Sequence, residues 1–174
     1  MKKTASFTRR SLAAAALALA LSASAAVSIS AAQAGTSTVQ PRPGWVVTPT
    51  KHDYKTLIAN VEAAARAHKM GLVTRASATI GAMKVFKKKI PGNMVIGLYH
   101  PRFAVPMLEA SVAAGIEAPI RVYITENPDH TATLSYKTPS FVFAPYMAEG
   151  GDKLKKLAAE LDAVFAAIAR DAAK

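Results

Sequence analysis

The sequence predicts an α+β domain in which a mixed sheet of about five strands carries its helices mainly on one face. Segments with the apolar periodicity of helices are interspersed with short segments of alternating or continuous apolar residues. A strand, turn and strand pattern at 120–125, 127–130 and 131–137 predicts a hairpin. An amphipathic pattern over 153–173 predicts a C-terminal helix. Helices interspersed with strands, together with a hairpin, are typical of a mixed sheet.

The first half of the chain is predicted to contain three strands and two helices. Asp53 is a suitable N-cap for the first helix, and Gly71 is placed to end it. A near-continuous apolar run after the turn at 91–93 indicates a central strand that is buried on both faces. The expected elements are a strand at 45–48, a helix at 54–69, a strand at 72–78, a short helix at 79–89 and a strand at 94–99.

A further helix is expected between the central strand and the hairpin. Its apolar pattern covers 103–114 and Gly115 follows, but Pro106 favours a start near that proline. The C-terminal helix carries one apolar stripe, which we expect to be buried against the sheet or against a second copy of the chain, so a homodimer is also compatible. The stripe consists of Leu154, Leu157, Leu161, Val164, Phe165 and Ile168.

Residues 1–34 have the layout of a bacterial export signal. A basic start is followed by a small-apolar stretch, and the segment ends on Ala32-Gln33-Ala34 before Gly35. Because the stretch is mostly Ala and Ser, it favours cleavage over a membrane anchor. Residues 8–12 resemble a twin-arginine signal, and the general export route stays equally open. We therefore expect a flexible linker at 35–44 and one domain at 45–174, periplasmic or secreted.

The composition limits which partners and cofactors are expected. The chain has 22 Lys and Arg, of which four lie in residues 1–34, and 11 Asp and Glu, none of them there, so the remainder carries +7. That charge favours an anionic small molecule, a lipid or contact with a membrane surface, while export makes nucleic acid an unexpected partner. Cysteine is absent, which excludes disulfides and thiolate metal sites. No histidine pair has the spacing of metal ligands, so neither a metal nor another cofactor is expected.

Several motifs resemble the domain of unknown function 302 family. They agree in order with that family over roughly 45–145, which is most of the predicted domain. The resemblance implies a compact α/β domain, and it implies no activity. The motifs are Asp53-Tyr54, Gly71-Leu72, Tyr99-His100-Pro101, Met107-Leu108-Glu109-Ala110, the run from Gly115 to Tyr123, and Leu134-Ser135-Tyr136 with Pro139.

Two groups of residues are candidates for ligand binding. His100 ends the central strand just before a helix, and Tyr99 and Arg102 flank it, so the three could together recognise a carboxylate or phosphate. The alternative is a strand-end histidine that is bonded to a nearby carbonyl. Arg121 and Tyr123 share a strand face, with Tyr136 on the partner strand; here the alternative is an internal ion pair, for example with Glu109.

Three classes of function remain open at this point. The sequence favours an exported accessory or binding protein, because it shows no catalytic constellation. One alternative is a small enzyme in which His100 acts as general base beside Tyr99 or Arg102. The other is a structural domain that binds a protein partner through a sheet edge or the C-terminal helix.

Overall fold

The computed structural model describes residues 37–174, so the predicted export signal lies outside the described residues. The strands are β1 (Trp45–Asp53), β2 (Gly71–Ala76), β3 (Asn93–Tyr99), β4 (Ile120–Glu126) and β5 (Thr131–Lys137). The α-helices are α1 (Tyr54–Ala67), α2 (Ala78–Phe86), α3 (Pro101–Ala110), α4 (Pro139–Phe143) and α5 (Met147–Ala172). Two 3-10 turns are η1 (Ala113–Glu117) and η2 (Ala144–Tyr146). The predicted α+β class is confirmed.

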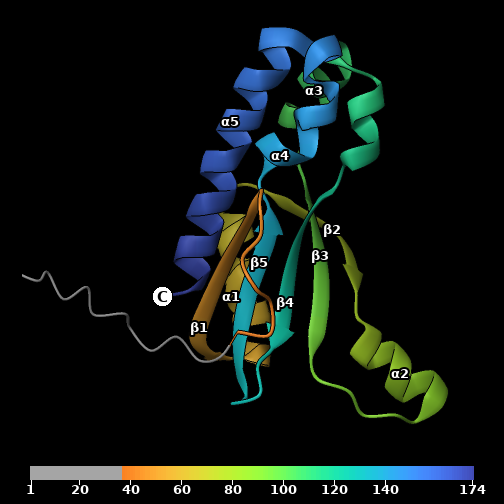
Figure 1. Ribbon diagram of the computed structural model, residues 1–174, viewed down its shortest axis with the longest axis vertical. Helices are drawn as coiled ribbons and strands as arrows, with labels where there is room; N and C mark the ends of the chain where they lie inside the picture. Colours follow the sequence, from red (N-terminus) through yellow and green to blue (C-terminus); the bar gives the residue numbers. More distant parts are fainter. Residues whose placement is uncertain (1–36) are drawn as a thin grey trace, which may run out of the picture. The chain divides into compact units, whose positions relative to one another are not determined.

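The five strands form one sheet in the order β1-β5-β4-β3-β2, and all four pairings are antiparallel. The expectation of a mixed sheet was wrong in this respect. Its basis was that helices separate strands, but α2 and α3 lie at opposite ends of the sheet and join neighbouring antiparallel strands (Figure 1). The connection through α1 leads from one edge strand to the other, so it too creates no parallel pair.

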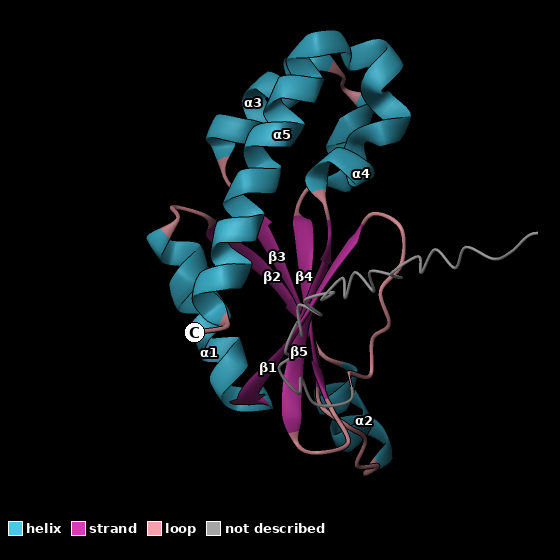
Figure 2. Cartoon of the chain, turned by 60° about the vertical axis from the view of Figure 1, so that its left-hand side comes forward, coloured by secondary structure: helices cyan, strands magenta, loops and turns pink. Residues whose placement is uncertain are grey.

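One face of the sheet is covered by helices and the other is not. Helices α1 and α5 lie side by side against the first face, and α3 and α4 pack on the far end of α5 (Figures 1 and 2). Because side chains alternate along each strand, β3, β4 and β5 send every second residue into this core. The strand residues buried there include Met94, Ile96, Leu98, Val122, Ile124, Leu134 and Tyr136.

The first helix begins as predicted and ends differently. The carboxylate of Asp53 accepts a hydrogen bond from the Thr56 amide at 2.8 Å, which confirms the N-cap. The helix ends at Ala67, and Lys69, not the predicted stop Gly71, has a left-handed conformation after it, with a φ of 58°. Gly71 instead begins β2.

The helix that follows the central strand does not begin near Pro106, so this prediction was wrong. Helix α3 begins at Pro101, a favoured first position, and contains Pro106 in its interior. It ends at Ala110, before the expected stop at Gly115, which lies in η1. The burial of Phe103 on the helix and the cap described below account for a start one turn earlier than the proline predicts.

Helix α5 buries its predicted stripe against the sheet and the other helices. All six residues are buried except Val164, which is half-buried. The helix begins at Met147, six residues earlier than predicted, but its backbone is interrupted at Gly151, where φ is 55° and ψ is −149°. Only glycine adopts that conformation without strain, so the regular part of the helix starts close to the predicted boundary.

The segment 37–44 also contacts the domain. Thr38 Oγ1 donates to the backbone carbonyl of Glu126 at 3.0 Å, and its amide donates to Asn127 Oδ1 at 3.2 Å. The Gly44 carbonyl accepts from the Thr138 amide at 2.9 Å. These bonds hold the segment along the sheet face that the helices leave uncovered (Figure 1).

Candidate functional site

The uncovered face of the sheet carries a set of polar and aromatic side chains that strand alternation brings into rows. Trp45 pairs with Lys137 across β1 and β5, and Arg121 pairs with Gly97 across β4 and β3. Tyr123 lies two residues after Arg121, and therefore on the same face of β4. The sequence prediction that Arg121 and Tyr123 share a face agrees with this register.

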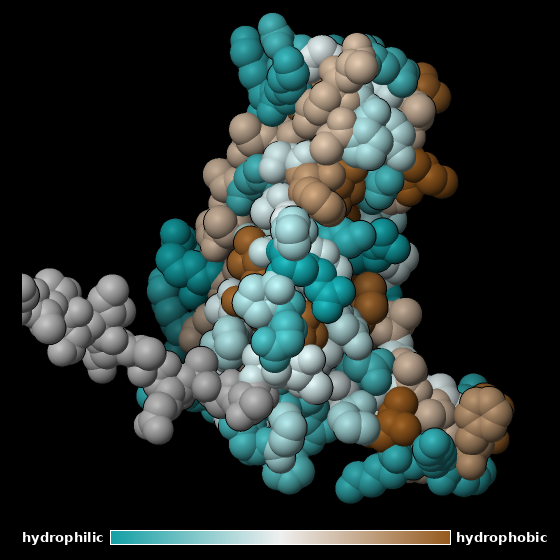
Figure 3. All heavy atoms as spheres, in the orientation of Figure 1, coloured by the Kyte–Doolittle hydropathy of each residue, from teal (hydrophilic) through white to brown (hydrophobic). Residues whose placement is uncertain are grey.

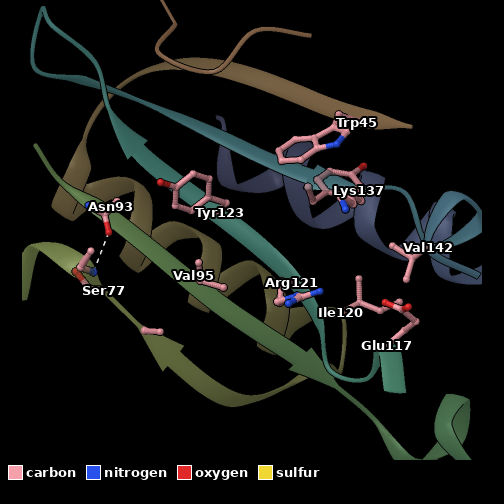
Figure 4. A pocket seen from close by; sticks show the side chains of 13 residues that line it. Trp45, Ser77, Asn93, Val95, Glu117, Ile120, Arg121, Tyr123, Lys137 and Val142 are labelled. Carbon is pink, nitrogen blue, oxygen red and sulfur yellow. Dashed lines mark hydrogen bonds between the residues drawn. The ribbon is translucent and has the colours of Figure 1, made fainter. Parts of the chain in front are cut away.

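A groove of about 730 Å³ opens on this face. Trp45 and Tyr123 provide aromatic walls from β1 and β4, and Val95, Ile120 and Val142 provide aliphatic surface (Figure 4). Polar groups come from Arg121, Lys137, Glu117, Ser77 and Asn93. The groove therefore combines an apolar lining with a few charged groups, as small-molecule sites do.

Two cations in the groove are available to a ligand. Among the described residues, neither Arg121 nor Lys137 has an ion-pair partner. The Glu109 carboxylate, considered as a partner for Arg121, bonds Lys153 instead. Lys137 Nζ lies 5.9 Å from the centroid of the Trp45 ring, so the ammonium and the indole border one part of the groove together.

The groove also contains one carboxylate, Glu117, which already has a hydrogen-bond partner. Glu117 Oε1 accepts a hydrogen bond from the Tyr146 hydroxyl at 2.9 Å. This bond raises the pKa of Tyr146 above its ordinary value, because the neutral phenol is the form that can donate to the carboxylate. Glu117 is therefore fixed at one end of the groove, beside Ile120 and Val142 (Figure 4).

The second predicted cluster lies outside this groove. His100 is the N-cap of α3, and its Nδ1 accepts a hydrogen bond from the Arg102 amide at 3.0 Å. The Arg102 guanidinium pairs with Glu160 at 3.4 Å and lies 4.3 Å from the centroid of the Phe103 ring. Tyr99 and His100 border a small apolar hollow of about 30 Å³, too small for an organic ligand.

Tyr136 also differs from the arrangement that the sequence suggested. It pairs with Val122, so its ring points to the helical face, where it packs on Phe165 at a centroid distance of 5.5 Å. The residue borders the groove, but its ring belongs to the core. Burial raises the pKa of the Tyr136 hydroxyl, because the charged phenolate is disfavoured away from water.

Sequence reasoning missed Trp45 and Lys137 as members of the site. Both were assigned to strands, but they are separated by 92 positions in the chain, and only the β1–β5 pairing brings them together. One signal was available: the chain has a single tryptophan, and in a basic domain that residue could have been tested as an aromatic partner for cations. Within residues 37–174, no group of His, Asp and Glu side chains is arranged to hold a metal ion.

Comparison with known proteins places the fold in a family. The model of the family described as "Domain of unknown function DUF302" matches residues 46–170. A crystal structure of an uncharacterized conserved DUF302 protein from Bacillus stearothermophilus is similar, with a TM-score of 0.67 and 14% sequence identity; the match covers 76% of this chain and 100% of that one. No curated protein matches the chain. The family match over residues 46–170, with the shared fold, shows that this chain belongs to the DUF302 family.

Proposed function

We propose that this protein is an exported accessory protein that binds a small organic anion in the groove on the uncovered face of the sheet. The observation that carries the proposal is the pair of cations without ion-pair partners among the described residues, Arg121 and Lys137, which line the same groove as Trp45 and Tyr123. A ligand with one acidic group and a compact apolar body complements this set of side chains. Export is supported by the sequence pattern of residues 1–34.

The chemistry favours a carboxylate over a neutral ligand. A guanidinium offers two parallel N–H donors to a carboxylate, and an ammonium adds a point charge. The aliphatic surface of Val95, Ile120 and Val142 then removes the apolar body of the ligand from water. Among the described residues, Glu117 forms no ion pair with either cation, and its Oε1 accepts from the Tyr146 hydroxyl.

Binding, rather than catalysis, is the role that the groove supports best. The described residues that line it include no histidine or cysteine; its serine, Ser77, caps α2, and its carboxylate, Glu117, accepts from the Tyr146 hydroxyl. His100, the base of the enzymatic alternative, uses Nδ1 to cap α3 and lies outside the groove. The remaining polar lining groups are donors and acceptors that fix the orientation of a bound molecule.

The single tryptophan provides a direct test. Trp45 lines the groove, so titration with cyclohexanecarboxylate should change its fluorescence in a saturable manner, whereas the neutral analogue cyclohexylmethanol should bind much more weakly. Because a hydrogen bond to a charged group contributes about 1.5–3 kcal/mol, Arg121→Gln and Lys137→Gln should each weaken binding by about tenfold or more.

A matched control removes the same charge elsewhere. Lys156 on α5 is exposed and has no ion-pair partner among the described residues, so Lys156→Gln should leave the titration unchanged. Equal responses to the acid and the alcohol, or equal losses in all three variants, would refute an anion site at Arg121 and Lys137.

A further inference from the structure

Helix α2 is held in place by several hydrogen bonds, but none of its own residues is buried. Ser77 caps it by accepting from the Ile80 amide, and Asn93 Oδ1 accepts from the Ala78 amide at 2.9 Å. Thr79 Oγ1 donates to the Pro91 carbonyl at 2.8 Å and accepts from the Asn93 amide at 3.0 Å. The helix is thus fixed to the start of β3 by polar bonds, yet none of its residues is buried.

The apolar side chains of α2 face solvent. The exposed fractions are 63% for Ile80, 47% for Met83, 68% for Val85 and 75% for Phe86. Figure 3 shows apolar residues at this end of the molecule, beside strongly hydrophilic ones. Ile80 and Met83 lie three positions apart and share one side of α2, whereas Val85 lies on another side. Exposed apolar side chains that gather on a folded protein mark an interaction site. The hydrogen bonds described above hold α2 in a position where these apolar side chains stay exposed.

The same segment carries a concentration of positive charge. Lys84 lies on the helix, and Lys87, Lys88 and Lys89 follow at its C-terminal end, all four exposed. Residues 78–92 contain no Asp or Glu. The nearest acidic group is Glu126, whose Oε2 accepts from the Gly92 amide at 2.7 Å. The hydrogen bond from the Gly92 amide is the main reason why the pKa of Glu126 is lowered, and it holds this carboxylate oxygen against the backbone.

A second groove lies along α2. Its volume is about 570 Å³; Ile80, Met83 and Ile90 line it, and two ammonium groups, Lys84 and Lys89, and one carboxylate, Glu126, border it. Apolar surface beneath two ammonium groups complements a molecule that has an anionic head and an apolar tail. A second copy of this chain fits this surface less well, because a twofold contact would place the lysines of α2 opposite the same lysines.

We propose that α2 and Lys87–Lys89 dock this protein on an anionic lipid bilayer. The apolar side chains of Val85 and Phe86, at the end of α2 next to the lysines, enter the boundary between head groups and acyl chains, and the lysines contact lipid phosphates. An exposed apolar helix that is followed by a cluster of lysines binds an anionic membrane surface through buried apolar area and electrostatic attraction. No helix of residues 37–174 is long and apolar enough to cross a bilayer, so the contact is peripheral for this part of the chain.

The absence of cysteine permits a site-specific test in the full chain. An environment-sensitive NBD fluorophore is attached at Val85→Cys and, as the matched control, at Val112→Cys, whose residue is 77% exposed at the other end of the sheet. Vesicles of mixed phosphatidylcholine and phosphatidylglycerol should shift the Val85→Cys emission to the blue and leave the Val112→Cys emission unchanged. Because the readout is local, binding by residues 1–34 does not produce this difference.

Variants that remove positive charge and a variant that removes an apolar side chain then separate the electrostatic from the hydrophobic contribution to vesicle binding. Since each basic residue near an anionic surface contributes about fivefold to binding, replacing Lys87, Lys88 and Lys89 by Gln should weaken the Val85→Cys response about a hundredfold. Replacing Lys51, Lys55 and Lys156 by Gln removes the same net charge and should have a much smaller effect. Phe86→Ser should also weaken the response, with urea unfolding unchanged because the side chain is exposed.

Three results would overturn the proposal. The first is an unshifted Val85→Cys emission with the anionic vesicles. The second is an equal shift with phosphatidylcholine alone, which would remove the role of the lysines. The third is concentration-dependent sedimentation without vesicles that Phe86→Ser abolishes, because α2 would then bind a second copy of the chain.

Discussion

The His68 imidazole and the Asp171 carboxylate meet at 2.8 Å and join the C-terminal end of α1 to the last turn of α5. Asp171 also accepts from Lys174 Nζ at 2.7 Å and from Arg170 Nε at 3.3 Å. The hydrogen bond from Lys174, followed by those from His68 and Arg170, holds the pKa of Asp171 well below its usual range. One carboxylate thus links the ends of the two helices that cover the sheet.

This arrangement predicts how stability depends on pH. A carboxyl group whose pKa is lower in the folded state stabilises the fold at any pH above its unfolded value, near 3.9, and loses that contribution as the pH falls towards the folded value. Asp171→Asn should therefore lower the urea midpoint at about pH 7, and the difference from the wild-type chain should shrink as the pH falls below about 4. Equilibrium unfolding in urea, repeated from about pH 7 to about pH 2, measures this difference in midpoint.

Asp152→Asn is the matched control, because Asp152 is an exposed partner of Lys155 in an ordinary surface pair. It should change the midpoint little at any pH. A deficit of Asp171→Asn that stays constant down to about pH 2 would contradict the assignment, because the lost contribution would then be independent of ionisation.

His100 should prove to be a structural cap. Because its Nδ1 accepts from the Arg102 amide, His100→Ala should destabilise the protein by about 0.5–2 kcal/mol, the usual effect of removing a helix N-cap. His100→Asn, which retains a capping acceptor, should recover most of that loss. Binding of cyclohexanecarboxylate by the variants should equal that of the wild-type chain. Lost binding with unchanged stability would instead return the ligand site to Tyr99, His100 and Arg102.

Phe165 should be among the most sensitive positions in the core. Its ring is fully buried, packs on Tyr136 and lies within the apolar stripe of α5. Phe165→Ala should lower the free energy of unfolding by about 3–5 kcal/mol, measured by urea denaturation. Ala166→Ser, at an exposed neighbouring position, should have little effect. If melting of the wild-type chain depends on its concentration and Phe165→Ala removes that dependence, the stripe contributes to a homodimer.

The export prediction concerns residues outside the described part of the structure. Protein from the periplasmic fraction should begin at Gly35 or within a few residues of it, because Ala32-Gln33-Ala34 has the small residues that a signal peptidase requires. Intact-mass measurement reports the new N-terminus directly. Recovery of the chain in the membrane fraction with residues 1–34 still attached would show an anchor instead. Replacing Arg9 and Arg10 by Lys would block export only if the twin-arginine route is used.

Local sequence predicted the five strands and four of the five α-helices of the described residues; it missed α4 and the continuation of β1 to Asp53. The Asp53 cap, the hairpin turn at 127–130 and the stripe of α5 each depend on residues a few positions apart, so their physical causes are visible in the chain itself. The same holds for the family motifs and for the strand face that Arg121 and Tyr123 share. Where a boundary was wrong, as at Pro106, burial outweighed a local preference.

Tertiary structure alone decided which faces and which distant residues meet. The antiparallel order of the strands, and not their number, places Trp45 beside Lys137 and turns Tyr136 away from Tyr123. The β1–β5 pairing joins segments far apart in the sequence, so neither segment alone shows which strand it pairs with. The same reason applies to α2: the sequence predicted a short helix at 79–89, but only its hydrogen bonds to Pro91 and Asn93 show that it lies beyond the end of the sheet, with none of its residues buried.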